Sequence, residues 1–201
     1  MAERRSALAS VLAQGGRDGA DGRRRLRLGE IRGWSLIQVA AFPARRAEVE
    51  RALLPLVGGR LPARVDEVID AAGLRLMRIG PEQLWIIGHD GSGLERQLRQ
   101  AIAADADVVT PLSHSRTRLS VEGDAAAAVL MKGVPLDFHP DAFRIDQAAL
   151  TGLHHTPVLI HRAGAGRFEI YAMRSFAASV WEWLTDAALE FGYEVVPGEV
   201  S

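Results

Sequence analysis

The sequence contains no cysteine, and this absence removes several kinds of chemistry at once. Disulfide bonds, thiolate nucleophiles and zinc or iron–sulfur centres with cysteine ligands are all excluded. The motifs HExxH, GxGxxG and GxxxxGK[ST] are also absent, so zinc-dependent hydrolysis, Rossmann-type nucleotide binding and P-loop chemistry lack their usual signatures. No apolar run approaches the roughly 18 residues of a transmembrane helix. The sequence therefore predicts no membrane-spanning segment.

The chain also has almost no net charge, because 24 Lys and Arg residues oppose 25 Asp and Glu residues. Such a balance gives no sequence-wide attraction for nucleic acid or an anionic membrane. Aromatic residues make up 6%, which leaves few stacking surfaces for single-stranded nucleic acid. The N-terminal apolar stretch is too short and too alanine-rich for a signal peptide. We expect a cytoplasmic protein that binds neither nucleic acid nor membrane.

Periodicity predicts the same order of elements twice along the chain. Strands are expected at residues 34–42, 73–80, 84–88, 116–123, 156–164 and 167–173, and helices at 44–58, 92–102, 124–133 and 175–191. Trp34 and Thr117 lie 83 residues apart, and Leu84 and Phe168 lie 84 apart. This constant offset indicates a duplicated β-α-β-β-α unit. The predicted fold class is α+β, with mixed or antiparallel sheets and helices packed around a common core.

The predicted domain organisation follows from this repeat. Residues 1–30, which include the glycine- and arginine-rich stretch GGRDGADGRRR, read as an N-terminal extension and a flexible link. Residues 31–201 form a single domain of two repeats, at about 31–109 and 110–196. Serines are expected to cap two helices, at Ser92 and Ser175. Gly133 is expected to close a third helix in a left-handed conformation.

The stretch SHSRTRLSVEG (113–123) combines serines, a histidine and arginines, so it could hold a nucleophile, an anion site or an ordinary strand. In an extended chain, alternation places His114, Arg116 and Arg118 on the face opposite Leu119 and the serines. A local Ser–His dyad is therefore disfavoured, and a structural strand is favoured. The three basic side chains on the other face could bind an anion or a partner's carboxylate.

The other polar clusters in the sequence do not predict a catalytic or metal-binding site. His154, His155 and His161 are close in sequence, but adjacent histidines of a strand face opposite ways and no acidic ligand has a supporting spacing, so no metal site is predicted. No catalytic or cofactor-binding residue is predicted either. Trp181 and Trp183 are two residues apart on one helix and cannot both point inward, so one is a core-edge or interface residue.

The loop GVPLDFHPDAF (133–143) mixes polar and aromatic residues, as functional loops often do, and carries His139 with Asp137 and Asp141 beside Lys132. The spacing of these residues does not indicate a particular reaction. Candidate subunit-interface residues from the whole sequence are His114, Arg116, Arg118, Lys132, His139, Trp181 and Trp183.

Several stretches together resemble a known family. LSHSRTRLSVEGDAAAAVLMKG, HPDAF, TPVLIHR and FEIYAMRSFAASVWEWL are similar, in order and spacing, to the gamma subunit of heterotetrameric sarcosine oxidase. RRSALA and RIGPEQLWIIG are similar as well. The resemblance covers nearly the whole chain, with little match at residues 13–25 and 58–72. The order of the motifs carries it, because no single motif is distinctive alone.

The resemblance implies a role that composition does not reveal. Assemblies of this family oxidise sarcosine to glycine, reduce oxygen to hydrogen peroxide, and pass the one-carbon unit to tetrahydrofolate or release it as formaldehyde. FAD, FMN and NAD are expected on the large subunits and zinc on the smallest, so the partners would be alpha, beta and delta subunits. No cofactor is expected on this chain, and the family implies no catalytic residue in it.

The gamma subunit is also similar to the folate-binding domain of the glycine-cleavage aminomethyltransferase, which agrees with the duplicated unit. Two alternatives stay open. The chain could serve a related N-methyl amino acid dehydrogenase, or it could be a stand-alone protein for folate binding or aminomethyl transfer.

Overall fold

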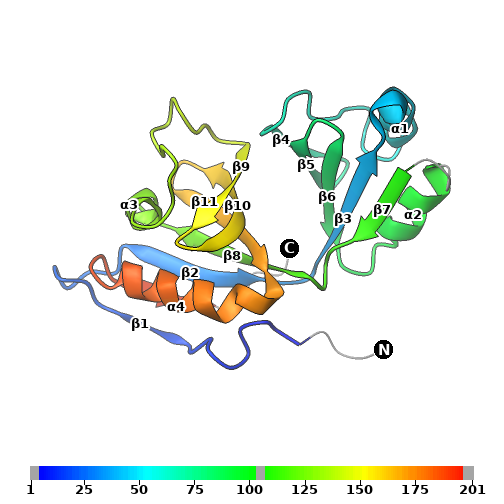
Figure 1. Cartoon of the computed structure of the whole chain (residues 1–201). Coiled ribbons are helices and arrows are strands. Elements are labelled where there is room, and N and C mark those ends of the chain that lie inside the picture. Colours follow the sequence, from blue (N-terminus) through cyan, green and yellow to red (C-terminus); the bar gives the residue numbers. More distant parts are fainter. Residues whose placement is uncertain (1–4, 103–106, 197–201) are drawn as a thin grey trace. The chain divides into compact units, whose positions relative to one another are not determined.

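The computed structural model describes residues 5–102 and 107–196, which form two compact units (Figure 1). Unit 1 contains residues 5–32, 115–145 and 150–196. Unit 2 contains residues 33–102, 107–114 and 146–149. Within the described ranges, no helix has both the length and the apolar character needed to cross a bilayer.

Unit 2 is a five-stranded antiparallel sheet with two helices. Its elements are β3 (Trp34–Ala41), η1 (Pro43–Arg45), α1 (Arg46–Leu53), β4 (Val68–Ala71), β5 (Leu74–Gly80), β6 (Gln83–His89), α2 (Leu94–Ala101) and β7 (Asp107–Pro111). The strand order is β4-β5-β6-β3-β7. The predicted hairpin of β5 and β6 is confirmed. α1 ends at Leu53, two residues before Pro55, because proline has no N–H for the helix and clashes with the preceding turn.

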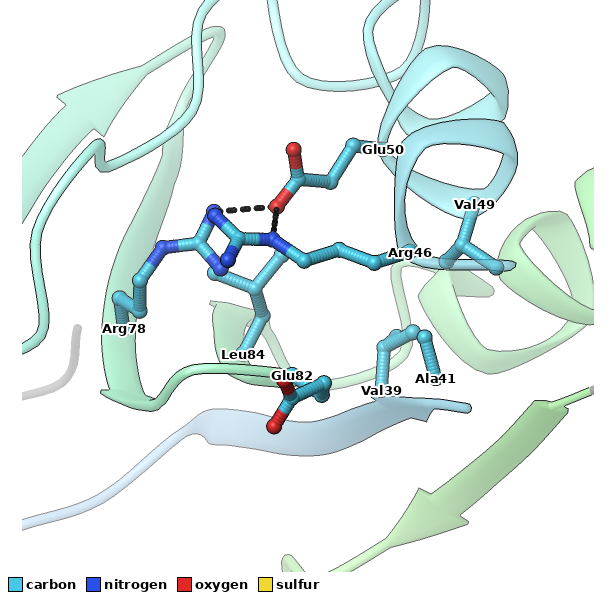
Figure 2. A pocket seen from close by; sticks show the side chains of 8 residues that line it. All are labelled: Val39, Ala41, Arg46, Val49, Glu50, Arg78, Glu82 and Leu84. Carbon is cyan, nitrogen blue, oxygen red and sulfur yellow. Dashed lines mark hydrogen bonds and ion pairs between the residues drawn. The ribbon is translucent and has the colours of Figure 1, made fainter. Parts of the chain in front are cut away.

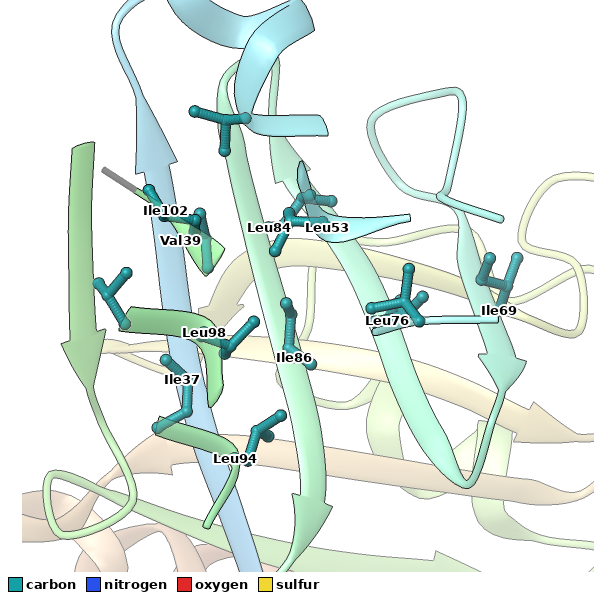
Figure 3. Close-up of a cluster of buried hydrophobic side chains, with 13 residues drawn as sticks. Ile37, Val39, Leu53, Ile69, Leu76, Leu84, Ile86, Leu94, Leu98 and Ile102 are labelled. Carbon is teal, nitrogen blue, oxygen red and sulfur yellow. The ribbon is translucent and has the colours of Figure 1, made fainter. Parts of the chain in front are cut away.

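The hydrophobic core of unit 2 lies between one face of this sheet and the two helices (Figure 3). Strand alternation turns Ile37 and Val39 of β3 toward it, beside Leu84 and Ile86 of β6. The helices contribute Val49, Leu53, Leu94 and Leu98. Fully burying a leucine is worth about 1.5–3 kcal/mol, so these side chains hold the helices on the sheet.

Unit 1 contains a seven-stranded mixed sheet. Its elements are β1 (Gly15–Arg17), β2 (Leu26–Ile31), β8 (Arg116–Glu122), α3 (Ala126–Met131), β9 (Gln147–Leu153), β10 (Thr156–Gly164), β11 (Arg167–Met173), η2 (Arg174–Phe176), α4 (Ala177–Ala188) and β12 (Tyr193–Val195), with the first three residues of β9 counted in unit 2. The strand order is β1-β12-β2-β8-β11-β10-β9. β12 runs parallel to β2, whereas β8 runs antiparallel to both β2 and β11.

The duplication is confirmed, and each repeat has two more strands than the predicted β-α-β-β-α unit. The first repeat runs β3-α1-β4-β5-β6-α2-β7, and the second runs β8-α3-β9-β10-β11-α4-β12. The strand orders β4-β5-β6-β3 and β9-β10-β11-β8 are equivalent. The α+β class and the mixed sheet are also confirmed, whereas a core common to both repeats stays a prediction.

The prediction of a flexible link within residues 1–30 is wrong where β1 and β2 form, at residues 15–17 and from residue 26 on, whereas residues 18–25 between them lie outside helices and strands. Leu26 and Leu28 of β2 are 1% and 0% exposed, and Leu8 is 0% exposed. Two of the glycines that suggested a loop, Gly16 and Gly19, serve close approach of the backbone. A Cβ at Gly16 would lie 2.5 Å from the carbonyl oxygen of Tyr193, so only glycine lets β1 pair with β12.

The predicted helix ends also need correction. Neither Ser92 nor Ser175 caps a helix through its side chain: Gly93, at φ 71°, precedes α2, and Ser175 lies within η2. Gly133 is not in the left-handed conformation. Its missing side chain leaves room for the ring of Trp183, whose Cζ2 would lie 2.3 Å from an added Cβ. Gly133 therefore serves packing between α3 and α4.

Candidate interface residues and a buried charge network

Four side chains from three neighbouring strands of unit 1 form a buried polar network. Arg118 of β8 binds Glu169 of β11 through two hydrogen bonds, each 3.0 Å long, from Nε and Nη2. The Tyr171 hydroxyl donates to Glu169 Oε2 at 2.8 Å, and His161 Nδ1 of β10 lies 3.6 Å from the same oxygen. All four residues are at least 95% buried.

Strand register explains why these residues meet. Tyr171 lies opposite Arg118 in the β8–β11 pairing, and Glu169 lies opposite His161 in the β10–β11 pairing. Glu169 and Tyr171, two residues apart, share one face of β11. The bidentate geometry is the strongest that an arginine and a carboxylate form, and the guanidinium also lies 5.5 Å from the Tyr171 ring centroid. The network thus joins β8, β10 and β11, and it is enclosed rather than open to a substrate.

This burial corrects the hypothesis that Arg118 lies on an exposed face. Alternation was predicted correctly, but both faces of the central part of β8 are covered, from Thr117 to Val121. Arg118 is 5% exposed and is occupied by Glu169, so it offers no free cation to a partner. The signal that sequence reasoning missed was FEIYA, where a glutamate interrupts an otherwise apolar strand.

His114 and Arg116 differ from Arg118. His114 is exposed, just before β8 begins. Arg116 is half-buried, and burial lowers the pKa of its guanidinium. Its Nη1 lies 3.3 Å from both the carbonyl and the hydroxyl oxygen of Ser115. A role of His114 and Arg116 in subunit contact stays a prediction.

The two tryptophans and Lys132 are engaged inside unit 1. Trp181 is 3% exposed, so it belongs to the core and not to a free surface, whereas Trp183 is half-buried over Gly133. Lys132 Nζ donates to the carbonyl of Ala187 at 2.7 Å. It also pairs with Glu190 at 2.8 Å and lies 4.8 Å from the Phe191 ring centroid. Trp181 is therefore the inward-pointing one of the two and is corrected as an interface candidate, whereas Trp183 lies at the edge of the core, as was predicted for one of them. Lys132 joins the end of α3 to the end of α4.

His139 lies where the sequence placed it, in the exposed loop between α3 and β9, with its side chain 66% exposed. Its backbone N–H donates to Asp137 Oδ1 at 2.8 Å, and its Nδ1 accepts from the N–H of Asp141 at 3.3 Å. These bonds build a turn. Within the described parts of the chain, no three His, Asp or Glu side chains gather as metal ligands.

A small hollow in unit 2 is a second polar feature (Figure 2). Arg78 is 3% exposed and donates to Glu50 at 2.6 Å, while Arg46 donates to the same oxygen at 2.9 Å. Burial by itself raises the pKa of the Glu50 carboxyl, but the hydrogen bonds from Arg46 and Arg78 outweigh it, so this pKa lies below its usual value. The space, about 10 Å³, holds no more than one water molecule, which is too small for a folate.

The fold and the polar clusters together define a class of protein. It is a small, duplicated α+β chain in which the charged networks described above join elements within one unit. The same architecture occurs in the glycine cleavage system aminomethyltransferase T from Bartonella henselae. The TM-score is 0.65 with 20% identity, over 88% of this chain and 48% of that one. At this identity the similarity shows the fold alone.

Residues 38–190 match the sarcosine oxidase gamma subunit family. The gamma subunit of sarcosine oxidase from an Arthrobacter species is 35% identical over 94% of this chain and 90% of its own length. That from Corynebacterium sp. strain U-96 is 33% identical over 85% and 82%. The chain belongs to the sarcosine oxidase gamma subunit family, which confirms the resemblance found in the sequence.

A solved structure agrees with this assignment. One chain of the heterotetrameric sarcosine oxidase from Corynebacterium sp. U-96, in complex with pyrrole 2-carboxylate, has a TM-score of 0.82 and 32% identity to this chain. The match covers 94% of this chain and 96% of that one. The similarity therefore extends over the complete fold rather than one repeat.

Proposed function

We propose that this chain is the gamma subunit of a heterotetrameric sarcosine oxidase and assembles with alpha, beta and delta subunits. The observation that best supports this proposal is the match over nearly the whole length to one chain of the Corynebacterium heterotetramer, with a TM-score of 0.82 and 96% of that chain covered. The polar networks of the described residues support a structural role. Arg118, Glu169 and their neighbours are closed within unit 1, and the hollow at Glu50 is too small for a substrate.

In this role the chain is non-catalytic, and the chemistry lies on its partners. The complex converts sarcosine to glycine with hydrogen peroxide, and yields formaldehyde or 5,10-methylenetetrahydrofolate. FAD, FMN, NAD, tetrahydrofolate and zinc are held by the other subunits. The support for these details is the family membership of the chain.

Co-expression with the three proposed partner subunits tests the proposal. Affinity purification through a tag on this chain, followed by size-exclusion chromatography, should recover a four-component assembly with sarcosine-dependent peroxide production. A chain that elutes alone while the three partners are present and folded would refute it. Assays with sarcosine and N-methylglutamate in parallel separate an oxidase for sarcosine from a related dehydrogenase.

The aminomethyltransferase-like fold favours one second candidate, a stand-alone folate-binding protein. Titration calorimetry of the isolated chain with tetrahydrofolate separates the two. Heat of binding with one-to-one stoichiometry would favour the second candidate, and its absence beside successful assembly would leave the subunit role.

A further inference from the structure

Two neighbouring histidines form the turn between β9 and β10 (Figure 1). β9 ends at Leu153 and β10 begins at Thr156, so the turn consists of His154 and His155. The backbone N–H of His154 donates to the carbonyl of Gly133 at 2.7 Å, which ties the turn to the segment that follows α3. Both histidine side chains are exposed. The two imidazoles therefore project into solvent from an anchored backbone.

The conformation of the turn brings the two rings together. His154 has a φ of 54°, in the left-handed region that side chains other than glycine enter at a cost. The ring centroids of His154 and His155 lie 4.1 Å apart, with an interplanar angle of 65°. Strand alternation predicted that these adjacent histidines face opposite ways, and this prediction is wrong because both residues lie in a turn.

The ring nitrogens of both histidines are available to a ligand. Within residues 5–102 and 107–196, neither imidazole makes a hydrogen bond or an ion pair with another residue, and no other two histidines are in ring contact. His161, the third histidine of the sequence cluster, is 0% exposed and lies 3.6 Å from Glu169. The Nδ1 of His139 accepts from the N–H of Asp141. The pair in the turn thus differs from the other histidines.

The chemistry of imidazole indicates which ligand this pair suits. Neutral imidazole binds Ni²⁺, Cu²⁺ and Zn²⁺ well, whereas Mg²⁺ and Ca²⁺ prefer oxygen ligands. Two imidazole ligands of one zinc ion each place a nitrogen about 2.0–2.1 Å from it, so their rings must be close neighbours. The second χ angle of histidine is broad, so exposed rings can each turn a nitrogen toward a common point without backbone movement. His154 and His155 meet these requirements.

We propose that His154 and His155 form a two-histidine site for a transition-metal dication of the Ni²⁺, Cu²⁺ and Zn²⁺ class. Two protein ligands leave further coordination positions, which water fills in the free chain. A site with two ligands is compatible with the finding that no three ligand side chains gather in the described ranges. The inference does not depend on the proposed function, because both ligands belong to this chain.

Titration calorimetry of the full chain with Ni²⁺ tests the site, with a chain that carries no polyhistidine tag. We expect one Ni²⁺ to bind per chain, and Mg²⁺ to give no heat of binding. His154→Asn and His155→Asn should each weaken Ni²⁺ binding about tenfold or more, because the second imidazole binds an ion that the first already holds nearby. Asparagine tolerates the left-handed conformation, so the turn is kept. A wild-type chain that takes up no Ni²⁺ would refute the proposal.

Matched controls are His114→Asn and His139→Asn, which each remove one exposed imidazole outside the turn. Both control variants should bind Ni²⁺ as wild type does. Equal weakening by the turn and the control variants would mean adventitious binding only, and would overturn the proposal. A loss confined to His139→Asn would place the ion in the loop with Asp137 and Asp141, and would overturn it as well.

Paramagnetic broadening of the imidazole NMR signals gives a second measurement that needs no variant. Cu²⁺, the strongest binder of the series, is added at less than one equivalent. The signals of His154 and His155 should broaden before those of the exposed His89, His114 and His139. Equal broadening of all five would show that the two neighbouring rings do not act as one site, and would contradict the proposal even if a turn variant failed to fold.

Discussion

Breaking the buried pair of Arg118 and Glu169 is expected to destabilise the protein strongly. In Arg118→Met, the aliphatic part of the side chain is kept while the guanidinium is lost. Glu169, 1% exposed, then loses both hydrogen bonds from the guanidinium, while the Tyr171 hydroxyl still donates to it at 2.8 Å. Removing one partner of a buried pair costs about 3–5 kcal/mol, because the remaining charge is left without compensation.

The magnitude can be checked by a graded series. At about 2–4 °C per kcal/mol for a chain of this length, Arg118→Met should lower the midpoint of thermal unfolding by roughly 10 °C. Tyr171→Phe removes one hydrogen bond to a charged group and should cost about 1.5–3 kcal/mol. The double variant Arg118→Met with Glu169→Met should recover much of the loss, since neither buried charge remains.

An exposed pair with the same geometry provides the control. Arg75 binds Asp70 through Nε at 2.8 Å and Nη2 at 3.0 Å, yet the Asp70 side chain is 64% exposed. Arg75→Met should cost less than about 1 kcal/mol. Urea unfolding followed by circular dichroism measures all five proteins, including wild type. If Arg118→Met and Arg75→Met cost the same, burial does not set the strength of this pair and the reasoning is wrong.

Three further predictions concern the other features. Leu8→Ala should cost about 3 kcal/mol in urea unfolding, because Leu8 is 0% exposed; a loss below 0.5 kcal/mol would mean that the N-terminal segment adds no core. Gly133→Ala should destabilise by about 1–3 kcal/mol and change the Trp183 fluorescence, since the added Cβ would lie 2.3 Å from Cζ2; an unchanged spectrum would contradict this contact. Because the folded-state pKa of Glu50 lies below its usual 4.5, its contribution to stability is present above that value and is lost as the pH falls through the folded pKa. Unfolding measured at pH 7 and at pH 3 should therefore show a smaller acid-induced loss for Glu50→Gln than for wild type, and equal losses would exclude the effect.

The periodic parts of the fold were predictable from sequence because the pattern of apolar and polar residues indicates which face of each element is buried. WSLIQVAAF and LWIIG gave the paired strands β3 and β6, and Pro55 gave the end of α1. Six strands were missed, namely β1, β2, β4, β7, β9 and β12, and β2 and β9 show two of the reasons. Arg27 and Gly29 interrupt β2, and QAALTGL of β9 has few strand-forming residues, so only pairing with neighbouring strands makes these segments extended.

The candidate residues were also predicted well where local sequence sets their environment, and poorly where distant segments set it. His139 was placed on an exposed loop correctly. A polar loop is identified from its own local sequence, without knowledge of which other segments pack nearby. Arg118 was not, since its sequence neighbours say which face it is on but not whether that face is covered. The buried Arg162 of β10 gave no sequence signal, because two of the three carbonyls to which it donates, those of Phe138 and Phe143, lie 24 and 19 residues earlier in the chain.

The pairing of β12 with both β1 and β2 has a consequence for synthesis on the ribosome. Residues 15–31 are made early, but the strand that pairs with both of them ends at Val195, near the end of the chain. Most of unit 2, by contrast, is one continuous stretch. Unit 2 can therefore begin to fold while the chain is still growing, and β2 can pair with β8 once residue 122 is made. β1 and the other edge of β2, by contrast, stay unpaired until residue 195 has been synthesised. Slow translation of the last third would prolong that exposure and favour aggregation.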